Sequence, residues 1–306
     1  MQKRILLTGS NGLLGQKITN LLVGRIGIDL LATSRGVNRN PEREGYKYRD
    51  ADLTDKEVWK DIFEKFRPTE VIHTAAITQV DKCEDEKKLC DEVNHHAVSY
   101  LCELCEEYGA RLIHISTDFV FDGEAGPYRE EDAPNPVNYY GLSKLKAEQA
   151  ILASGVSAVI LRTILLYGIS SAMSRSNIIL WVKKSLEEKK PINVVHDQFR
   201  SPTLVEDLAW ASVAAAMKDV EGIFHISGPE YMSIIDIAKE AARFWELDED
   251  LISEIDSASL GQRAKRPPKT GFILLKAQTE LGYKPHTLQQ GLAVLDKQIK
   301  EMAEIM

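Results

Sequence analysis

Short apolar runs and longer amphipathic stretches alternate through the first half of the chain. The apolar runs predict β-strands at residues 4–8, 30–34, 46–49, 70–73, 111–115 and 156–162. The amphipathic stretches predict helices at residues 13–23, 55–66, 85–108 and 139–153. Several apolar runs are continuous instead of alternating, as is typical of strands covered on both faces. The pattern therefore predicts an α/β fold with a doubly wound parallel sheet of the Rossmann type.

Predicted strands and helices alternate less regularly after about residue 165. The later segments predict helices at residues 177–189, 205–217 and 233–245, and strands at residues 192–195 and 223–226. We expect residues 1–165 to form the dinucleotide-binding domain and residues 166–306 to form mainly a smaller C-terminal substrate-binding lobe. One or two segments of this lobe are expected to return to the sheet, and the groove between the two parts is the expected binding site.

The charge balance limits the expected partners. The 306 residues carry a net charge of −8, which argues against a general nucleic-acid or membrane partner because both are anionic. Neither a secretory signal pattern nor an apolar run of roughly 18 residues is present. These features predict a cytoplasmic protein with a small-molecule ligand. A homodimer is compatible with the sequence, which does not determine the oligomeric state.

A glycine-rich turn follows the first predicted strand and opens the first predicted helix. Gly9, Gly12 and Gly15 let the backbone approach a pyrophosphate, and Asn11 and Leu13 belong to the same turn. The N–H groups at a helix start bind negative charge, so the turn predicts a dinucleotide phosphate site. The alternative is an ordinary strand–helix turn, but the flanking elements provide the context that the motif requires.

The end of the second predicted strand indicates which dinucleotide is bound. An NAD-binding protein usually has an acidic residue there, whereas this chain has Ser34 and Arg35, with Arg39 shortly after. Arg35 can bind a ribose 2′-phosphate, which predicts NADPH as the cofactor. The alternative is that Arg35 is a solvated surface residue.

Two further pairs of residues fit a bound dinucleotide. Asp52 and Leu53 follow the third strand, where a carboxylate can accept a hydrogen bond from the adenine amino group. Ala75 and Ala76 follow the fourth strand, where small side chains let a flat ring pass close to the backbone. The alternative for Asp52 is a capping role before the next helix.

Tyr140 and Lys144 are four residues apart and project from one face of a predicted helix. Reduction of a carbonyl by hydride leaves an alkoxide that must be protonated, and we expect Tyr140 to donate that proton. We expect the Lys144 ammonium to lower the pKa of Tyr140 and to bind the nicotinamide ribose. Thr117 follows the fifth strand and can donate a hydrogen bond to the developing oxyanion; its alternative role is to cap the loop.

The cysteines and histidines do not form a metal-binding pattern. Cys102 and Cys105 form a CxxC pair late in a predicted helix, without a second pair at ligand spacing. Core or surface positions are expected for the candidate histidines, which are His73, His95, His96 and His114. The sequence therefore predicts free thiols and no metal site. Mg²⁺ is compatible with the predicted chemistry, but no residue pattern supports it.

Several motifs together resemble the dTDP-4-dehydrorhamnose reductase family of the extended short-chain dehydrogenases/reductases. The similar segments are residues 8–15, 67–76, 80–84, 116–123, 138–144, 161–163, 197–203 and 207–209. The string Ser-Thr-Asp-Phe-Val-Phe-Asp-Gly at residues 116–123 is the most specific of them. The resemblance implies NADPH-dependent reduction of the 4-keto group of a dTDP-linked 6-deoxy-hexulose, with Tyr140 as the proton donor. It places these residues on the substrate side: Lys82, Thr117, Asp118, Val120, Phe121 and Arg200.

The chain departs from the family pattern on the substrate side. Residues 164–166 are Ile-Leu-Leu where the family usually has Ser-Trp-Val, and Arg200 replaces the usual glycine after Asp-Gln-Phe. Arg200 is expected either to bind a substrate phosphate or to pair with a neighbouring carboxylate. Arg263, Arg266 and Lys269 offer a second candidate diphosphate contact, with a solvated face as the alternative.

Two other functions are compatible with the same motifs. The family includes a non-catalytic relative, the regulatory beta subunit of methionine adenosyltransferase, which binds NADP and a partner protein. A nucleotide-sugar epimerase or dehydratase is the other alternative. Such enzymes often retain NAD through an acidic residue after the second strand, and this chain lacks that residue.

Overall fold

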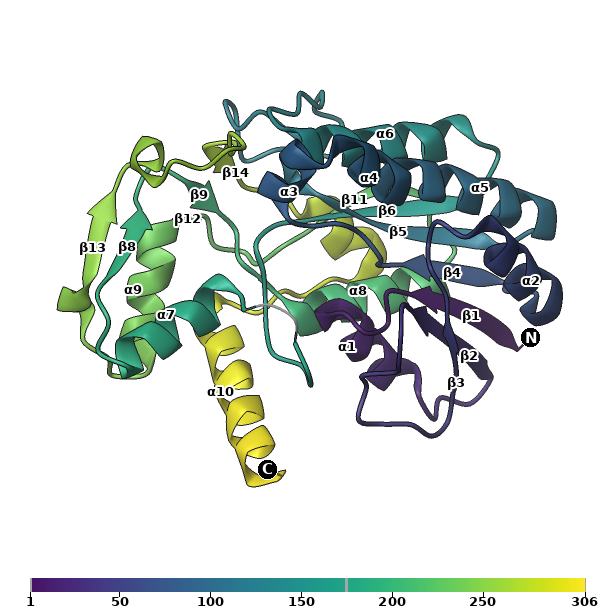
Figure 1. Cartoon of the computed structure of the whole chain (residues 1–306), viewed down its shortest axis with the longest axis horizontal. Coiled ribbons are helices and arrows are strands. Elements are labelled where there is room, and N and C mark those ends of the chain that lie inside the picture. Colours follow the sequence, from purple (N-terminus) through teal and green to yellow (C-terminus); the bar gives the residue numbers. More distant parts are fainter. Residues whose placement is uncertain (1, 174–175, 306) are drawn as a thin grey trace.

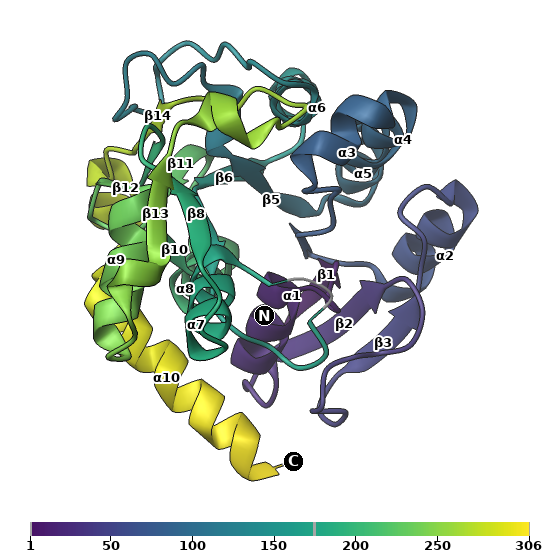
Figure 2. The same ribbon diagram turned by 60° about the vertical axis from the view of Figure 1, so that its left-hand side comes forward.

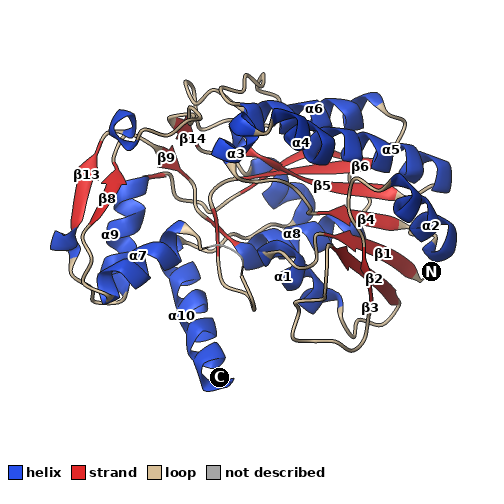
Figure 3. Cartoon of the chain, in the orientation of Figure 1, coloured by secondary structure: helices blue, strands red, loops and turns tan. Residues whose placement is uncertain are grey.

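Seven parallel strands form the central sheet. The computed structural model describes residues 2–173 and 176–305, and its main sheet has the strand order β11-β6-β5-β4-β1-β2-β3 (Figure 1, Figure 3). The strands are β1 (Lys3–Thr8), β2 (Ile28–Ser34), β3 (Lys47–Asp50), β4 (Glu70–His73), β5 (Arg111–Thr117), β6 (Ala158–Thr163) and β11 (Gly222–Ile226). This order is that of a Rossmann-type sheet, so the predicted fold class is confirmed.

Helices cover both faces of this sheet (Figure 2). Apolar residues of α2 (Lys56–Phe66), α5 (Ala97–Tyr108) and α6 (Tyr139–Ala153) pack on one face. Those of α1 (Leu13–Leu22) and α8 (Val205–Met217) pack on the other. Because both faces of the sheet are covered, apolar residues can follow one another directly in the sequence of its strands.

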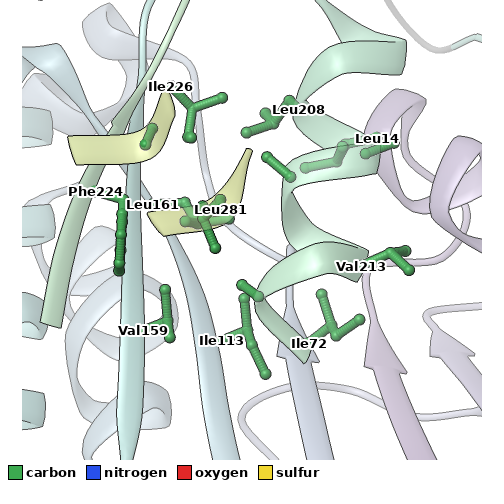
Figure 4. Close-up of a cluster of buried hydrophobic side chains, with 14 of the residues drawn as sticks. Leu14, Ile72, Ile113, Val159, Leu161, Leu208, Val213, Phe224, Ile226 and Leu281 are labelled. Carbon is green, nitrogen blue, oxygen red and sulfur yellow. The ribbon is translucent and has the colours of Figure 1, made fainter. Parts of the chain in front are cut away.

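The core on the α8 side shows how the sheet is stabilised. Leu208 and Val213 of α8 belong to one buried cluster with Ile72, Ile113 and Leu161 of the strands (Figure 4). Each of these side chains is at most 4% exposed. Removing such apolar surface from water is the main favourable contribution to folding.

The predicted helix at residues 85–108 is interrupted. The chain instead forms α3 (Val80–Asp85), α4 (Lys87–Asp91) and a π-helical turn (Glu92–His96) that leads into α5. Inside that turn, the Asn94 side chain donates to the carbonyl oxygen of Ile77 at 3.0 Å and accepts from its N–H at 2.8 Å. These bonds tie the turn to the loop after β4, a contact that periodicity does not reveal.

The part of the chain after residue 166 has its own apolar cluster. It is built by α7 (Ile178–Glu187), α9 (Ile234–Phe244), α10 (Leu288–Ile305) and the parallel pair of β8 (Ile192–Val195) and β13 (Ile252–Ile255). The same part of the chain also contains shorter elements: β7 (Leu166–Tyr167), β9 (Phe199–Arg200), β10 (Thr203–Leu204), β12 (Met232–Ser233), β14 (Lys269–Thr270) and the single turns Glu249–Leu251, Ser257–Leu260 and Ala277–Leu281. The last of these turns packs in the core of the main sheet through Ala277 and Leu281. However, α8 and β11 belong to the layers of the main sheet. No helix within the described ranges is long and apolar enough to cross a bilayer.

Candidate active site

A cavity of about 470 Å³ opens at the carboxyl ends of the strands on both sides of β1. Ligands of open parallel sheets bind at this position. The predicted site residues that line it are Gly9, Asn11, Gly12, Ser34, Arg35, Asp52, Leu53, Ala75, Ala76 and Lys82. The structure therefore brings the dinucleotide-binding segments together. Leu13 and Gly15 lie just behind, in the first turn of α1.

The glycines of the turn are required by close approaches of the backbone. Gly9 has φ +71°, and a Cβ there would lie 2.7 Å from the backbone nitrogen of Ala75. A Cβ on Gly15 would lie 2.3 Å from the Gly9 carbonyl oxygen. Gly12 caps α1 without a side-chain hydrogen bond, so the first N–H groups of the helix are available to a phosphate.

Asn11 holds the loop that carries the predicted phosphate-binding arginines. Its side-chain nitrogen donates to the carbonyl oxygens of Arg35 (3.3 Å) and Val37 (2.9 Å), and its side-chain oxygen accepts from the N–H of Arg39 at 2.8 Å. Both arginines line the cavity, and the Arg35 side chain is 80% exposed. An exposed guanidinium at the cavity edge is accessible to a ribose phosphate.

Asp52 lines the cavity and does not have the capping role that was its alternative, because Asp55 caps α2. The Asp52 carboxylate instead accepts from the N–H of Thr54 at 2.9 Å and from the Thr54 hydroxyl at 2.8 Å, within the loop before the helix. The N–H bond of Thr54 holds the pKa of Asp52 below its ordinary value, and Arg35 contributes less.

Tyr140 and Thr117 are neighbours at the end of β5. The Thr117 hydroxyl is close enough to lower the pKa of the Tyr140 phenol, and the Tyr140 ring meets the Phe119 ring edge-on at 5.9 Å. Gly141 was not among the predicted site residues, but it allows α6 to begin this close to Phe119. A Cβ at residue 141 would lie 2.0 Å from the Phe119 carbonyl oxygen. Thr117 also caps a 3₁₀ turn by accepting from the N–H of Phe119, so its alternative role is realised too.

The predicted catalytic residues Thr117, Tyr140 and Lys144 do not line this cavity. Tyr140 is 9% exposed and packs with Cys83 and Cys90 against Ile77, and Ile77 lines the cavity. The sulfur atoms of Cys83 and Cys90 lie 2.7 Å apart, whereas the sequence had drawn attention to a different cysteine pair. In the part of the chain that is described, no group of His, Cys, Asp and Glu is suited to hold a metal ion.

The expected lowering of the Tyr140 pKa is wrong for this structure. Burial raises the pKa of Tyr140 well above its ordinary value, although Thr117 opposes this. The Lys144 ammonium donates to Nε2 of His114 at 2.8 Å and to the carbonyl oxygen of Ile115 at 2.7 Å. Burial lowers the pKa of Lys144 to about 8.

The substrate-side residues fall into two groups. Lys82 lines the cavity and lies 3.6 Å from Glu86. Val120 and Phe121 are fully buried in the main core, and Phe121 stacks on Tyr128 at 4.1 Å, so neither offers an open surface to a sugar.

The basic residues on the substrate side are largely neutralised. Arg200 is 3% exposed, and its Nε lies 3.7 Å from the Asp118 carboxylate. Arg266 forms two 2.7 Å bonds to Asp81, and Arg263 pairs with Asp85. Lys269 lies over the ring of Phe199. The structure thus realises the carboxylate pairing that was one alternative for Arg200, and it ties residues 263–266 to α3.

Comparison with known proteins agrees with this geometry. The family described as RmlD substrate binding domain matches residues 3–301. A dTDP-4-dehydrorhamnose reductase of Aggregatibacter actinomycetemcomitans is 30% identical, over 98% of this chain and 99% of the relative. The methionine adenosyltransferase 2 subunit beta of Bos taurus is 33% identical, over 87% of this chain and 78% of the relative.

Solved structures show the same architecture. A dTDP-4-dehydrorhamnose reductase from Clostridium acetobutylicum has a TM-score of 0.86 and 28% identity, covering 97% of this chain and 99% of the other. The Bacillus anthracis enzyme of that name, solved in complex with NADP, has a TM-score of 0.83 and 26% identity, covering 97% and 100%.

Proposed function

The chain belongs to the RmlD substrate binding domain family, and we propose that it is an NADPH-dependent reductase of a nucleotide-linked 4-keto-6-deoxy-hexulose. The reaction would be of the type that converts dTDP-4-dehydrorhamnose to dTDP-L-rhamnose. The observation that carries the proposal is the placement of Tyr140 next to Thr117 at the end of β5, packed against Ile77 of the dinucleotide cavity.

The residues around the cavity fit a bound dinucleotide phosphate. The uncapped start of α1 and the glycine turn form a cradle that side chains at Gly9 or Gly15 would fill. Arg35 and Arg39 add positive charge at the ribose end, and no carboxylate stands at residues 34 and 35 to repel a 2′-phosphate. NADPH, when bound, would supply the hydride.

The protein's own contribution is to hold and release a proton. A ketone that accepts a hydride becomes an alkoxide, and the phenol of Tyr140 is the proposed source of its proton. The raised pKa of Tyr140 keeps this phenol protonated at neutral pH, which is the form that the reductive direction needs. Thr117 lies beside the phenol, and Lys144 supplies a buried cation one helical turn away.

A non-catalytic NADP-binding subunit is the second candidate. Two observations favour it: the similarity to methionine adenosyltransferase 2 subunit beta, and the burial of Tyr140, which packs against Ile77 and does not line the cavity. An epimerase or dehydratase that retains NAD is less well supported, because Ser34 and Arg35 stand where such proteins usually have an acidic residue.

A turnover assay separates these candidates. NADPH oxidation is followed with dTDP-4-dehydrorhamnose, and the wild type is compared with Tyr140→Phe. The matched control is Tyr139→Phe, since Tyr139 is the neighbouring phenol on α6 and binds Asp91. We expect Tyr140→Phe to lower kcat by about 10²-fold or more with NADPH affinity retained, and Tyr139→Phe to stay near the wild type. NADPH binding without turnover of any nucleotide-linked keto sugar would support the subunit.

A further inference from the structure

Cys83 and Cys90 form a pair of free thiols in the protein interior. Cys83 lies in α3 and Cys90 in α4, both side chains are fully buried, and their sulfur atoms are 2.7 Å apart. A disulfide bond has an S–S distance of about 2.05 Å, so the two atoms need to approach each other by only about 0.7 Å. The pair is therefore placed for direct oxidation, and the proposed reduction makes no use of it.

The thiol pair contacts both the wall of the dinucleotide cavity and the start of α6. The Cys83 sulfur lies 3.9 Å from the carbonyl oxygen of Ile77, a residue that lines the cavity. The Cys90 sulfur lies 3.3 Å from the Ser143 hydroxyl oxygen, and that hydroxyl donates to the carbonyl oxygen of Tyr140 at 2.8 Å. Both cysteines also pack with the Tyr140 side chain in one buried cluster. A change of bonding at the sulfur atoms therefore affects the residue that is proposed to donate the proton.

We propose that Cys83 and Cys90 are a redox modification site: oxidation by a peroxide joins them in a disulfide next to Tyr140, and the disulfide slows turnover until a thiol reduces it. The effect on turnover rests on the proposed role of Tyr140 as the proton donor. The formation of the disulfide does not depend on that role, because it follows from the contact between the two sulfur atoms.

The two thiols differ in acidity, which assigns them different roles. The hydrogen bond with Cys83 lowers the pKa of Cys90 below its ordinary value, although burial opposes this effect. The same bond, together with burial, raises the pKa of Cys83. The thiolate is the form that reacts with an oxidant, so Cys90 is the attacking sulfur and Cys83 is the thiol that closes the disulfide. By contrast, burial raises the pKa of Cys102 to about 11, which makes this thiol less reactive.

Hydrogen peroxide is an oxidant of the required class. The Cys90 thiolate attacks one peroxide oxygen, an S–O bond forms as the O–O bond breaks, and the released hydroxide takes up a proton to give water. The Cys83 sulfur then attacks the Cys90 sulfur, and the sulfenic hydroxyl group leaves with the Cys83 proton as a second water. The two thiols together lose two electrons, which the peroxide accepts.

The burial of both thiols restricts the oxidant to a small molecule. Lys82 and Leu89 are each adjacent in the sequence to one of the cysteines, and both line the dinucleotide cavity. The sulfur atoms are thus carried by residues next to the cavity wall, and the cavity offers a small peroxide a route toward them.

The disulfide should disturb the first turn of α6. It has no S–H hydrogen, so Cys90 can no longer donate to the Ser143 hydroxyl, which is bonded to the backbone of Tyr140. The approach of the sulfur atoms by about 0.7 Å also changes the packing against the Tyr140 ring. A displacement of a reacting group by about 1 Å can lower a rate by about 10²-fold. Because the shift here is smaller, we expect kcat to fall about tenfold.

The test treats the full-length protein with hydrogen peroxide, which catalase removes before each measurement. Peptide mass spectrometry without prior reduction identifies the cysteines that are joined. Turnover with NADPH and dTDP-4-dehydrorhamnose is measured before treatment, after treatment and after addition of dithiothreitol. We expect a disulfide between Cys83 and Cys90, a decrease of kcat by about tenfold, and recovery of kcat when the disulfide is reduced. A different cysteine pairing, no disulfide, or a Cys83–Cys90 disulfide with unchanged kcat would overturn the inference.

Two variants separate the pair from the other thiols. In Cys90→Ala the ratio of kcat after and before treatment should stay near one, and Cys83→Ala replaces it if Cys90→Ala does not fold. Cys102→Ala removes a buried thiol outside the pair, so its ratio should fall about tenfold as in the wild type. An equal fall in Cys90→Ala and Cys102→Ala would overturn the inference. If the untreated wild type reduces no keto sugar, the proposed function fails, and the mapped disulfide alone decides whether Cys83 and Cys90 are the modification site.

Discussion

The ammonium nitrogen of Lys144 lies 2.8 Å from Nε2 of His114, and both side chains are buried. His114 stacks on His73 with ring centroids 5.3 Å apart, and Nδ1 of His73 lies 2.8 Å from the hydroxyl oxygen of Thr8. Burial lowers the pKa of His73 to about 3 and that of His114 well below its ordinary value. Both rings are therefore neutral, and His114 can accept a hydrogen bond from Lys144. Buried polar groups thus connect the proposed catalytic lysine with the strand end before the glycine turn.

Lys144 should make the protein more stable as the pH rises through the alkaline range. Burial lowers the pKa of Lys144 to about 8 from its ordinary value of 10.5. Between these pH values the unfolded chain holds a proton that the folded protein has released. The free energy of unfolding should therefore rise relative to Lys144→Met, by about 3 kcal/mol at most. Urea unfolding of both proteins at about pH 7 and about pH 10 measures the difference, and an equal pH response would contradict the prediction.

Arg35→Ala should weaken NADPH binding about tenfold and leave NADH binding nearly unchanged. The reason is the loss of a cation at the ribose end of the cavity, where Arg35 is 80% exposed and the contact is partly screened by water. Fluorescence titration with both dinucleotides measures the two affinities. Arg25→Ala is the control, because Arg25 is an exposed arginine outside the cavity. An equal loss of affinity for NADPH and NADH would show that Arg35 does not bind the 2′-phosphate.

Gly141→Ala should reduce both stability and turnover. The added Cβ would lie 2.0 Å from the Phe119 carbonyl oxygen, so the start of α6 must move away from the 3₁₀ turn Asp118–Val120 and carry Tyr140 with it. Such overpacking costs about 1–3 kcal/mol or more. Gly12→Ala is a useful comparison for stability because its nearest contact would be 3.3 Å. Similar unfolding midpoints for the two variants would contradict this explanation.

Replacing only one residue of the buried ion pair Arg162–Glu148 should destabilise the protein more than replacing both. The side chains are 2% and 1% exposed, and two of the bonds between them measure 2.7 Å and 3.0 Å. Arg162→Met would leave the Glu148 carboxylate without its cation and should lower the free energy of unfolding by about 3–5 kcal/mol. The double variant Arg162→Met/Glu148→Leu should recover most of the loss in denaturant unfolding. A double variant as unstable as the single one would indicate that packing, not charge, is responsible.

Hydrophobic periodicity was sufficient to predict the sheet because its strands are covered on both faces. The runs at 70–73 and 111–115 each contain two adjacent apolar residues, Val71-Ile72 and Leu112-Ile113, and both are central strands. Periodicity could not show the break at Glu86 or the π-helical turn that follows. The turn depends on Asn94 binding the backbone of Ile77, and this contact exists only after the chain has folded.

The cofactor side of the site was more predictable than the substrate side. Gly9, Arg35 and Ala75 each follow a parallel strand, and the fold places all such strand ends along one edge. The role of Arg266 depends instead on Asp81, which is 185 residues away in the sequence. Likewise, the pKa of Tyr140 follows from burial against Ile77, which a four-residue spacing from Lys144 does not reveal.

The edge strand β11 has a consequence for the order in which the protein is completed during synthesis. This strand, residues 222–226, pairs with β6, and α8 covers the apolar face beside it. A nascent chain that has emerged only to residue 165 would leave the outer edge of β6 unpaired and would lack the part of the α1 face that α8 covers. The main sheet is therefore complete only after Ile226, the last residue of β11, has been synthesised.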